Sequence, residues 1–404
     1  MLKNKNFQNF LKSSIIRRYS KAIDNFLNQH PHLKQIKKYI PSQYLNISSK
    51  ISNEYLYLIC TKTAKLIADH VIPSISEDQI IAETNAGLGL ITTELLERSV
   101  KRVRMYESCP DFRVDLKKFD AAFPGRVELF IKNIFHLGRF AYLDKQDGVN
   151  RVESLLKNVP KKAWIDDPVM TIVGTLPNTN FIRYLIKSLA LQTGLALHGR
   201  IQIFGIIKPH DYYVFTATPK ENLRKYQYIS ILFQLLFDLE KLETFPRNIF
   251  LPWERSRGKR KEIKELMFVK INFKKQLPVT MDQILPLYYF IKQLYGTGNN
   301  LVLPTVEKWV PSSGLNVLVP SQKHEDYNRE INIFTKFRDL TPSQISAIFK
   351  EVINNNSYLG SPFTGMIENE LVKSESVETS LADATLEKSI SRDVEKLNLQ
   401  DEFD

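Results

Sequence analysis

Cysteine and histidine are scarce in this sequence, and long apolar runs are missing. The 404 residues contain two cysteines, Cys60 and Cys109, and seven histidines, with no Cys or His pair at metal-ligand spacing. This excludes a disulfide framework, gives no support to a structural metal site and favours a reducing compartment. The most apolar segment, residues 229–239, has the length of a core helix and falls well short of the roughly 18 residues that a membrane span needs.

Glycine and proline are also too few for a collagen-like or linker-dominated chain, with 15 and 19 residues. Hydrophobic residues make up 43% and aromatic residues 11%, which excludes a wholly disordered protein. A chain of this length predicts two or three domains.

Positive charge dominates the body of the chain. The formal net charge is +12, but residues 367–404 carry a net −7, which leaves +19 on residues 1–366. Such a body favours a phosphate-bearing polymer as partner, because neutralising phosphates releases condensed counterions. A solvated, lysine-rich surface is the alternative.

The start of the chain lacks acidic residues before Asp24, while Phe7, Phe10 and Ile15 recur at helical spacing among Lys and Arg. A basic amphipathic helix of this kind is typical of a mitochondrial transit peptide. The segment Arg17-Arg18-Tyr19-Ser20 resembles a matrix processing site, so we expect removal of residues 1–19. A nucleic-acid-binding arm or a disordered tail is the alternative.

Alternating strand and helix patterns follow. A helix is predicted from Ser52 through Leu56 and Leu58 to near Pro73, and a second, strongly apolar helix over residues 226–239. Strand patterns occupy residues 79–84, 102–107, 127–131, 170–175, 200–207 and 265–273. This alternation predicts an α/β fold with a mainly parallel, doubly wound sheet, closed by an edge antiparallel pair.

The end of the chain changes character. Helical patterns at residues 281–295 and 342–352, the latter after a plausible N-cap at Thr341, predict a small all-α domain. The acidic, aromatic-poor remainder predicts a disordered tail with transient helix. The predicted segments are a transit peptide (1–19), an N-terminal helical extension (20–75), a sheet domain (76–278), a helical domain (279–366) and an acidic tail (367–404).

A glycine-rich turn is the clearest candidate binding site. Glu83 ends a strand, Asn85, Gly87 and Gly89 open a helix, and Glu107 ends the next strand. Glycines let backbone N–H groups approach a ligand. The turn lacks the third glycine of a dinucleotide site and the Gly-Lys-Ser/Thr of a P-loop. It suits S-adenosylmethionine, with Glu107 on the ribose hydroxyls; a tight turn without a ligand is the alternative.

A longer series of motifs carries a family resemblance. They are residues 83–92, Tyr106-Glu107-Ser108, residues 198–201, residues 250–254 and Leu340-Thr341-Pro342, in this order. Together they resemble the mitochondrial transcription factor B family, in particular its second paralogue, over roughly residues 50–366. The resemblance implies a methyltransferase-like (Rossmann-like) sheet domain and a small all-α C-terminal domain, derived from rRNA adenine N6-dimethyltransferases.

The sequence departs from the active members of that family at the methyl-transfer motif. Active members carry Asn-Leu-Pro-Phe/Tyr after the fourth strand, and this chain has Thr175, Leu176, Pro177 and Asn178. A flipped adenine needs an acceptor for its amino group and an aromatic face, so we expect the catalytic motif to be degenerate and to serve as a structural strand-to-helix turn. Asn133 stands where relatives carry an Asp near the cofactor adenine, so we expect weak to moderate S-adenosylmethionine binding.

A basic run at residues 247–275 carries a net charge of +7 and is interleaved with Trp253, Phe268 and Phe273. Cations and exposed rings together favour single-stranded nucleic acid. The alternative is a solvated loop whose aromatic residues lie in the core. The predicted nucleic-acid-binding residues are Arg255, Arg257, Lys259, Arg260 and Lys261.

The resemblance implies a transcription initiation factor of the mitochondrial matrix nucleoid. Such a factor binds the single-subunit mitochondrial RNA polymerase and melted promoter DNA. One alternative is an active S-adenosylmethionine-dependent dimethyltransferase of the small-subunit mitochondrial rRNA. Another is an rRNA-binding assembly factor without catalysis.

Overall fold

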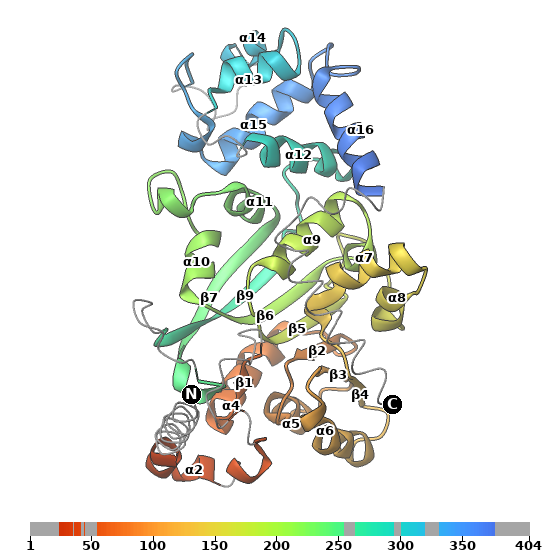
Figure 1. Ribbon diagram of the computed structural model, residues 1–404, viewed down its shortest axis with the longest axis vertical. Coiled ribbons are helices and arrows are strands. Elements are labelled where there is room, and N and C mark those ends of the chain that lie inside the picture. Colours follow the sequence, from red (N-terminus) through yellow and green to blue (C-terminus); the bar gives the residue numbers. More distant parts are fainter. Residues whose placement is uncertain are drawn as a thin grey trace, which may run out of the picture.

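The computed structural model describes residues 24–34, 36–41, 44, 55–253, 263–294, 300–319 and 331–375. Figure 1 shows a twisted sheet in the middle of the molecule, C-terminal helices above it and the described helices of roughly the first 120 residues below it. In these described ranges no helix is long and apolar enough to cross a bilayer.

Seven strands form the main sheet. They are β2 (Ile80–Thr84), β3 (Val103–Tyr106), β4 (Val127–Phe130), β5 (Met170–Thr175), β6 (Ile201–Ile207), β7 (Phe237–Pro246) and β9 (Glu265–Phe273). Their order is β4-β3-β2-β5-β6-β9-β7. The first five in this order are parallel, and β9 and β7 add an antiparallel pair at the edge.

Helices cover both faces of this sheet. One face carries α7 (Leu137–Asp147), α8 (Arg151–Leu156), α9 (Asn180–Ala190), α10 (Pro209–Phe215) and α11 (Tyr228–Leu236); the other carries α4 (Thr61–Val71), α5 (Leu90–Glu97) and α6 (Pro110–Ala122). Successive strand residues alternate between the two cores: on β2, Ile80 and Ala82 join the first and Ile81 joins the second. Every residue of the central strands β2, β5 and β6 is buried, because both faces of the sheet are covered there.

Short elements connect these layers. The N-terminal helix α2 (Pro31–Lys34) lies below the sheet, and β1 (Tyr57–Leu58) pairs with β8 (Phe250–Leu251) in a separate two-stranded sheet. The 3₁₀ helices are η1 (Lys37–Tyr39), η2 (Ile72–Ser74), η3 (Ile134–His136), η4 (Gly194–His198), η5 (Leu223–Lys225), η6 (Arg247–Ile249), η7 (Met281–Gln283) and η8 (Phe337–Asp339).

A helical unit follows the sheet. It contains α12 (Ile284–Leu294), α13 (Val302–Trp309), α14 (Ser313–Leu318), α15 (Pro342–Ile353) and α16 (Pro362–Glu375). Helix α12 packs against α9 and α11, and the buried ring of Phe290 makes edge contacts with Trp309 and Phe349. Thr341 caps α15 by accepting a hydrogen bond from the Gln344 backbone N–H, as predicted. The predicted fold class, a methyltransferase-like sheet domain followed by a small all-α domain, is confirmed.

Two predicted helices were wrong in part. Residues 237–239 belong to β7, because Phe237 pairs with Phe273 and the chain continues along the free edge of β9. Residues 57–58 form β1, because their backbone pairs with β8, almost 200 residues away, and the helix begins at Thr61. Local apolar spacing does not reveal a long-range strand partner.

Helix α16 extends beyond residue 366, the predicted start of the acidic tail. Its residues Phe363 and Ile367 are buried in the same core as α12 and α15. Residues 367–375 are therefore helical, which corrects that boundary, and residues 376–404 lie outside the described ranges, as does the transit-peptide prediction for residues 1–19.

Candidate cofactor site

The predicted site residues meet at one edge of the sheet. Glu83, Glu107 and Thr175 lie at or directly after the carboxyl ends of β2, β3 and β5, and Asn133 follows β4. These strands are neighbours and parallel. Ligands of open α/β sheets bind in the crevice outside such strand ends.

The turn between β2 and α5 needs its glycines. Gly87 and Gly89 have φ values of +52° and +66°, and Gly89 is the N-cap of α5. A Cβ at Gly89 would lie 2.7 Å from the Phe119 ring. Asn85 also has a positive φ, of +52°, which Asn tolerates better than most side chains. The turn is therefore a tight one whose glycines are fixed by both conformation and packing.

The side chain of Glu83 is hydrogen-bonded to the helix that follows it, α5. Its Oε2 accepts hydrogen bonds from the Thr92 backbone N, at 3.0 Å, and from the Thr92 hydroxyl. Burial raises the pKa of Glu83 to about 8, although the two bonds from Thr92 oppose the shift. Thr92, which replaces the third glycine of a dinucleotide turn, thus supplies the donors for a buried carboxyl.

Glu107, the predicted ribose contact, is fully buried and bonded within the protein. Its Oε2 accepts from the Gly87 backbone N at 2.8 Å, and its Oε1 accepts from the Cys109 backbone N at 2.7 Å and from the Tyr57 hydroxyl at 3.2 Å. Burial raises the pKa of Glu107 above its usual range, against these hydrogen bonds. Both carboxylate oxygens are therefore already engaged where a ribose would need them.

The residues of the degenerate motif are also hydrogen-bonded within the protein. The Thr175 hydroxyl accepts from Asn85 Nδ2 at 2.9 Å and donates to the Leu56 carbonyl at 3.0 Å. Asn178 Oδ1 accepts from the Asn180 backbone N at 2.8 Å, at the start of α9. Leu176 is buried, and its backbone N bonds the Ile206 carbonyl. Together with Pro177, these residues make a strand-to-helix turn.

Two polar atoms at the neighbouring strand ends are unsatisfied. Asn133 Oδ1 accepts from the Phe135 backbone N at 2.9 Å, which fixes the amide, and its Nδ2 is buried without a hydrogen-bond partner among the described residues. The same holds for Ser108 Oγ, which follows β3. Buried polar atoms are normally paired, so this corner retains hydrogen-bonding capacity for a ligand.

S-Adenosylmethionine does not fit the site in this conformation. The cavity at the turn measures about 10 Å³ and is lined by Leu56, Leu58, Glu83, Asn85 and Thr175, among others. A volume of this size holds roughly one water, whereas sites for small molecules typically measure about 300 to 1,000 Å³. Ser108 Oγ and Asn133 Nδ2 keep hydrogen-bonding capacity among the described residues, whereas the turn has no room for S-adenosylmethionine.

Two aromatic rings and one arginine of the predicted basic run have structural roles, whereas its Lys264 and Lys275 are exposed. Phe268 and Phe273 are buried in the two cores, and the buried Arg247 guanidinium donates to the Phe250 and Pro252 carbonyls. The interleaved rings of β9 therefore cannot stack on bases, which corrects that part of the prediction. The predicted contact residues Arg255, Arg257, Lys259, Arg260 and Lys261 lie outside the described ranges.

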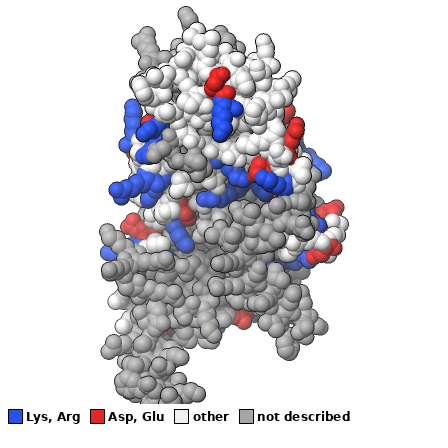
Figure 2. Space-filling view, turned by 45° about the horizontal axis from the view of Figure 1, so that its top comes forward, with Lys and Arg blue, Asp and Glu red and all other residues white. Residues whose placement is uncertain are grey.

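Cations paired with tyrosine rings lie elsewhere. Two of the pairs join different elements, so local sequence patterns carry no signal for them, whereas Lys292 and Tyr288 stand four residues apart on one helix. The exposed Arg183 of α9 donates to the Tyr228 hydroxyl at 2.8 Å and lies over its ring. Lys225 lies 4.7 Å from the centre of the Tyr213 ring, and Lys292 lies over Tyr288 of α12. On the face drawn in Figure 2, Lys and Arg side chains gather in a band across the molecule.

Known proteins resemble the chain in sequence. No protein-family model matches. Dimethyladenosine transferase 2, mitochondrial, of Drosophila melanogaster is 29% identical over 394 residues, which cover 87% of this chain and 86% of the relative. The chain is homologous to mitochondrial dimethyladenosine transferases. Dimethyladenosine transferase 1, mitochondrial, of Xenopus tropicalis is 27% identical over 180 residues, which is 44% of this chain and 48% of that relative.

A solved structure is similar to a more limited degree. The crystal structure of the 23S rRNA methyltransferase ErmE has a TM-score of 0.44 and 15% sequence identity, covering 73% of this chain and 99% of that one.

Proposed function

We propose that this protein is a mitochondrial transcription initiation factor that uses a dimethyltransferase fold as a nucleic-acid-binding scaffold and has lost methyl transfer. One observation carries the proposal: the hydroxyl of Thr175 is bonded to Asn85 and Leu56, and the side chain of Asn178 accepts a hydrogen bond from the Asn180 backbone N. A flipped adenine would find neither a free amide acceptor nor an aromatic face at this motif. On this proposal the chain keeps the dimethyltransferase fold and lacks the contacts that would hold a flipped adenine.

The charge distribution supports a role on nucleic acid. Residues 1–19 carry five of the 19 net positive charges, so the body that remains after their removal, residues 20–366, has a net charge of +14 and attracts phosphates without regard to sequence. The pairs Arg183–Tyr228, Lys225–Tyr213 and Lys292–Tyr288 combine cations with aromatic faces, as single-strand-binding surfaces do. We propose that this surface contacts melted promoter DNA, and that the partner is the mitochondrial RNA polymerase, as the family resemblance implies.

The proposed location is the mitochondrial matrix, at the nucleoid. Two observations support it: both curated relatives are named mitochondrial, and the acid-free start of the chain has the composition of a transit peptide. N-terminal sequencing of protein recovered from mitochondria should find Ser20 first. A mature chain that keeps Met1 would contradict the presequence.

A second function is an rRNA adenine N6-dimethyltransferase dependent on S-adenosylmethionine, the activity in the names of the relatives. Ser108 Oγ and Asn133 Nδ2 favour it, because they have no hydrogen-bond partner in the described ranges and follow β3 and β4, where we would place an adenosyl group. In that case Glu83, Asn85, Gly87, Gly89, Glu107 and Asn133 would form the cofactor site. On our proposal the same residues bind S-adenosylmethionine weakly.

Run-off transcription from a mitochondrial promoter tests the main proposal. Purified mitochondrial RNA polymerase should give promoter-dependent transcripts with this protein and few without it, and a pre-melted bubble template should reduce the dependence. Equal transcript levels with and without the protein would overturn the proposal. A parallel methylation assay on a small-subunit rRNA hairpin should stay near background. Efficient dimethylation would favour the second function, and rRNA binding with neither activity would indicate an assembly factor.

A further inference from the structure

The segment around Tyr57 lies where the cofactor would bind. Strand β1 is held in place by β8, with Tyr57 opposite Leu251 and Leu58 opposite Phe250, and the Ile59 backbone N bonds the Ile249 carbonyl at 3.0 Å. Residues 56–59 are all buried. The segment is therefore an ordered part of the fold that is anchored from outside the site.

The Tyr57 ring covers the glycine-rich turn. A Cβ placed on Gly87 would lie 2.6 Å from Tyr57 Cδ1, so the ring fills the space that a glycine normally leaves for a ligand. The ring also packs on Phe112, with centroids 4.7 Å apart, and on Tyr44, at 5.0 Å. Its hydroxyl bonds Glu107, the carboxylate expected to hold a ribose.

The degenerate motif holds the same segment from the other side. Thr175 Oγ1 donates to the Leu56 carbonyl and accepts a hydrogen bond from Asn85 Nδ2. Gly87, Glu107 and Thr175 thus contact residues 56–57 of the chain itself, and Asn85 supports this arrangement through Thr175. About 10 Å³ of cavity remains beside them.

We propose that the Leu56–Tyr57–Leu58 segment is a built-in occupant of the cofactor site, so that S-adenosylmethionine binds only when this segment leaves. At the end of the site where an adenine would lie, Ser108 Oγ and Asn133 Nδ2 are unpaired among the described residues. At the end where a ribose would lie, next to Glu107, the segment itself fills the space. The inference goes beyond the proposed function, because it concerns what occupies the site and holds whether or not the protein acts in transcription. A closed site lowers apparent affinity by the fraction of open molecules.

Titration calorimetry with S-adenosylmethionine on the full chain tests this. Tyr57→Ala should bind roughly ten to a hundred times more tightly than the wild type, because the ring that fills the site is gone. Tyr57→Phe, which removes the bond to Glu107 and keeps the ring, should give a smaller gain. Tyr142→Ala, on α7, is the matched control and should bind like the wild type. Adding Glu107→Ala to Tyr57→Ala should abolish the gain.

Hydrogen exchange on the unmodified protein gives an independent readout that survives any folding defect of the variants. Saturating S-adenosylmethionine should speed amide exchange at Ile59, whose backbone N donates to the Ile249 carbonyl, because β1 must leave β8. Tight binding by the wild type with unchanged protection of residues 57–59 would overturn the inference. So would the absence of binding by both Tyr57→Ala and Tyr57→Phe when both are folded. Neither result bears on promoter-dependent transcription, so the two proposals fail separately.

Discussion

The buried carboxyl of Glu83 is hydrogen-bonded to Thr92 across the glycine-rich turn, through both the backbone N–H and the hydroxyl of the threonine. This pair joins the end of β2 to the first turn of α5. It also places an ionisable group in the core next to a second one, Glu107, which contributes to its raised pKa.

Glu83 should make the protein less stable as pH rises. Its folded pKa of about 8 exceeds the unfolded value of 4.5, so the folded state keeps a proton that the unfolded state releases in this range. Stability is therefore fully present below pH 4.5 and is lost towards pH 8, with a slope of up to about 1.4 kcal/mol per pH unit. Glu83→Gln should flatten the slope in denaturant titrations. The exposed control Glu153→Gln should not, and an unchanged slope in Glu83→Gln would refute the assignment.

Thr175→Val should destabilise the fold by about 1 to 3 kcal/mol, because it leaves the Leu56 carbonyl and Asn85 Nδ2 without the Thr175 hydroxyl in a buried place. Thr175→Ser keeps the hydroxyl and should cost less. Urea unfolding measures both. Equal stability of the valine variant and the wild type would mean that the hydroxyl does not tie β1 to the sheet.

The surface cations on α9, η5 and α12 should contribute to DNA affinity. Neutralising Arg183, Lys225 and Lys292 to Gln should flatten the plot of log affinity against log salt by about 0.7 to 0.9 for each phosphate that these side chains neutralise. The matched control neutralises Lys62, Lys65 and Lys118, which are exposed on α4 and α6. Fluorescence anisotropy with single-stranded and bubble DNA should give a flatter slope for the first triple variant than for the control triple variant. Identical slopes would mean that Arg183, Lys225 and Lys292 do not contact DNA.

Neutralising Arg257, Lys259, Arg260 and Lys261 in the same assay tests the predicted basic run. A reduction in slope comparable to that of the surface triple would support nucleic-acid binding there. No change would mean that the run is a solvated loop.

The acidic end of the chain should compete with nucleic acid for the basic body. Residues 376–404 carry a net −5, so truncation after Glu375 should tighten non-specific DNA binding at low salt. The gain should fade near 0.15 M salt, where the Debye length is about 8 Å. Truncation after Met366 would not isolate the effect of charge, because it also removes the buried Ile367 and should lower the Tm. Equal DNA affinity with and without residues 376–404 would mean that this segment does not compete with nucleic acid.

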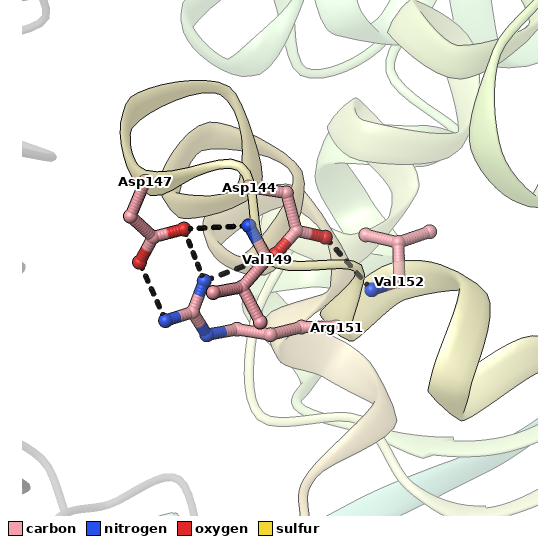
Figure 3. A network of polar contacts seen from close by, with 5 residues as sticks. All are labelled: Asp144, Asp147, Val149, Arg151 and Val152. Atoms are coloured by element: carbon pink, nitrogen blue, oxygen red, sulfur yellow. Dashed lines mark hydrogen bonds and ion pairs between the residues drawn. The ribbon is translucent and has the colours of Figure 1, made fainter.

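The corner between α7 and α8 is held by the ion-pair network in Figure 3. Arg151 bonds both oxygens of Asp147, at 2.8 and 2.6 Å, and also Asp144 at 3.1 Å. The hydrogen bonds from Arg151 lower the pKa of Asp147 from 3.8 to about 2. The stability that ionised Asp147 contributes to the folded protein is therefore present above pH 3.8 and is lost as pH falls towards 2.

Asp147→Asn should accordingly lower the Tm at neutral pH, and its difference from the wild type should narrow as pH falls through that window. Thermal unfolding at several pH values measures this. A difference that stays constant from neutral pH to pH 2 would show that charge on Asp147 does not matter.

Local sequence patterns were enough to predict the α/β fold with its mainly parallel sheet, and the positions of Glu83, Glu107 and Thr175 at the ends of strands. Apolar runs fully buried on both faces identify parallel strands, and β5 and β9 were predicted to the residue. The glycine turn, Glu107 and the altered motif at Thr175 and Asn178 are visible as local patterns, because parallel strands bring their carboxyl ends to one edge.

What fills that site depends on tertiary contacts. Residues 56–58 look helical by local spacing, yet β8 supplies a strand partner almost 200 residues away. Pairing of this kind depends on chain segments that meet only after folding, so no periodicity reports it. The same holds for Phe268 and Phe273, for which the sequence left two alternatives open, stacking rings in a basic run or core residues. They are buried because β9 lies between β6 and β7, where both of its faces are covered.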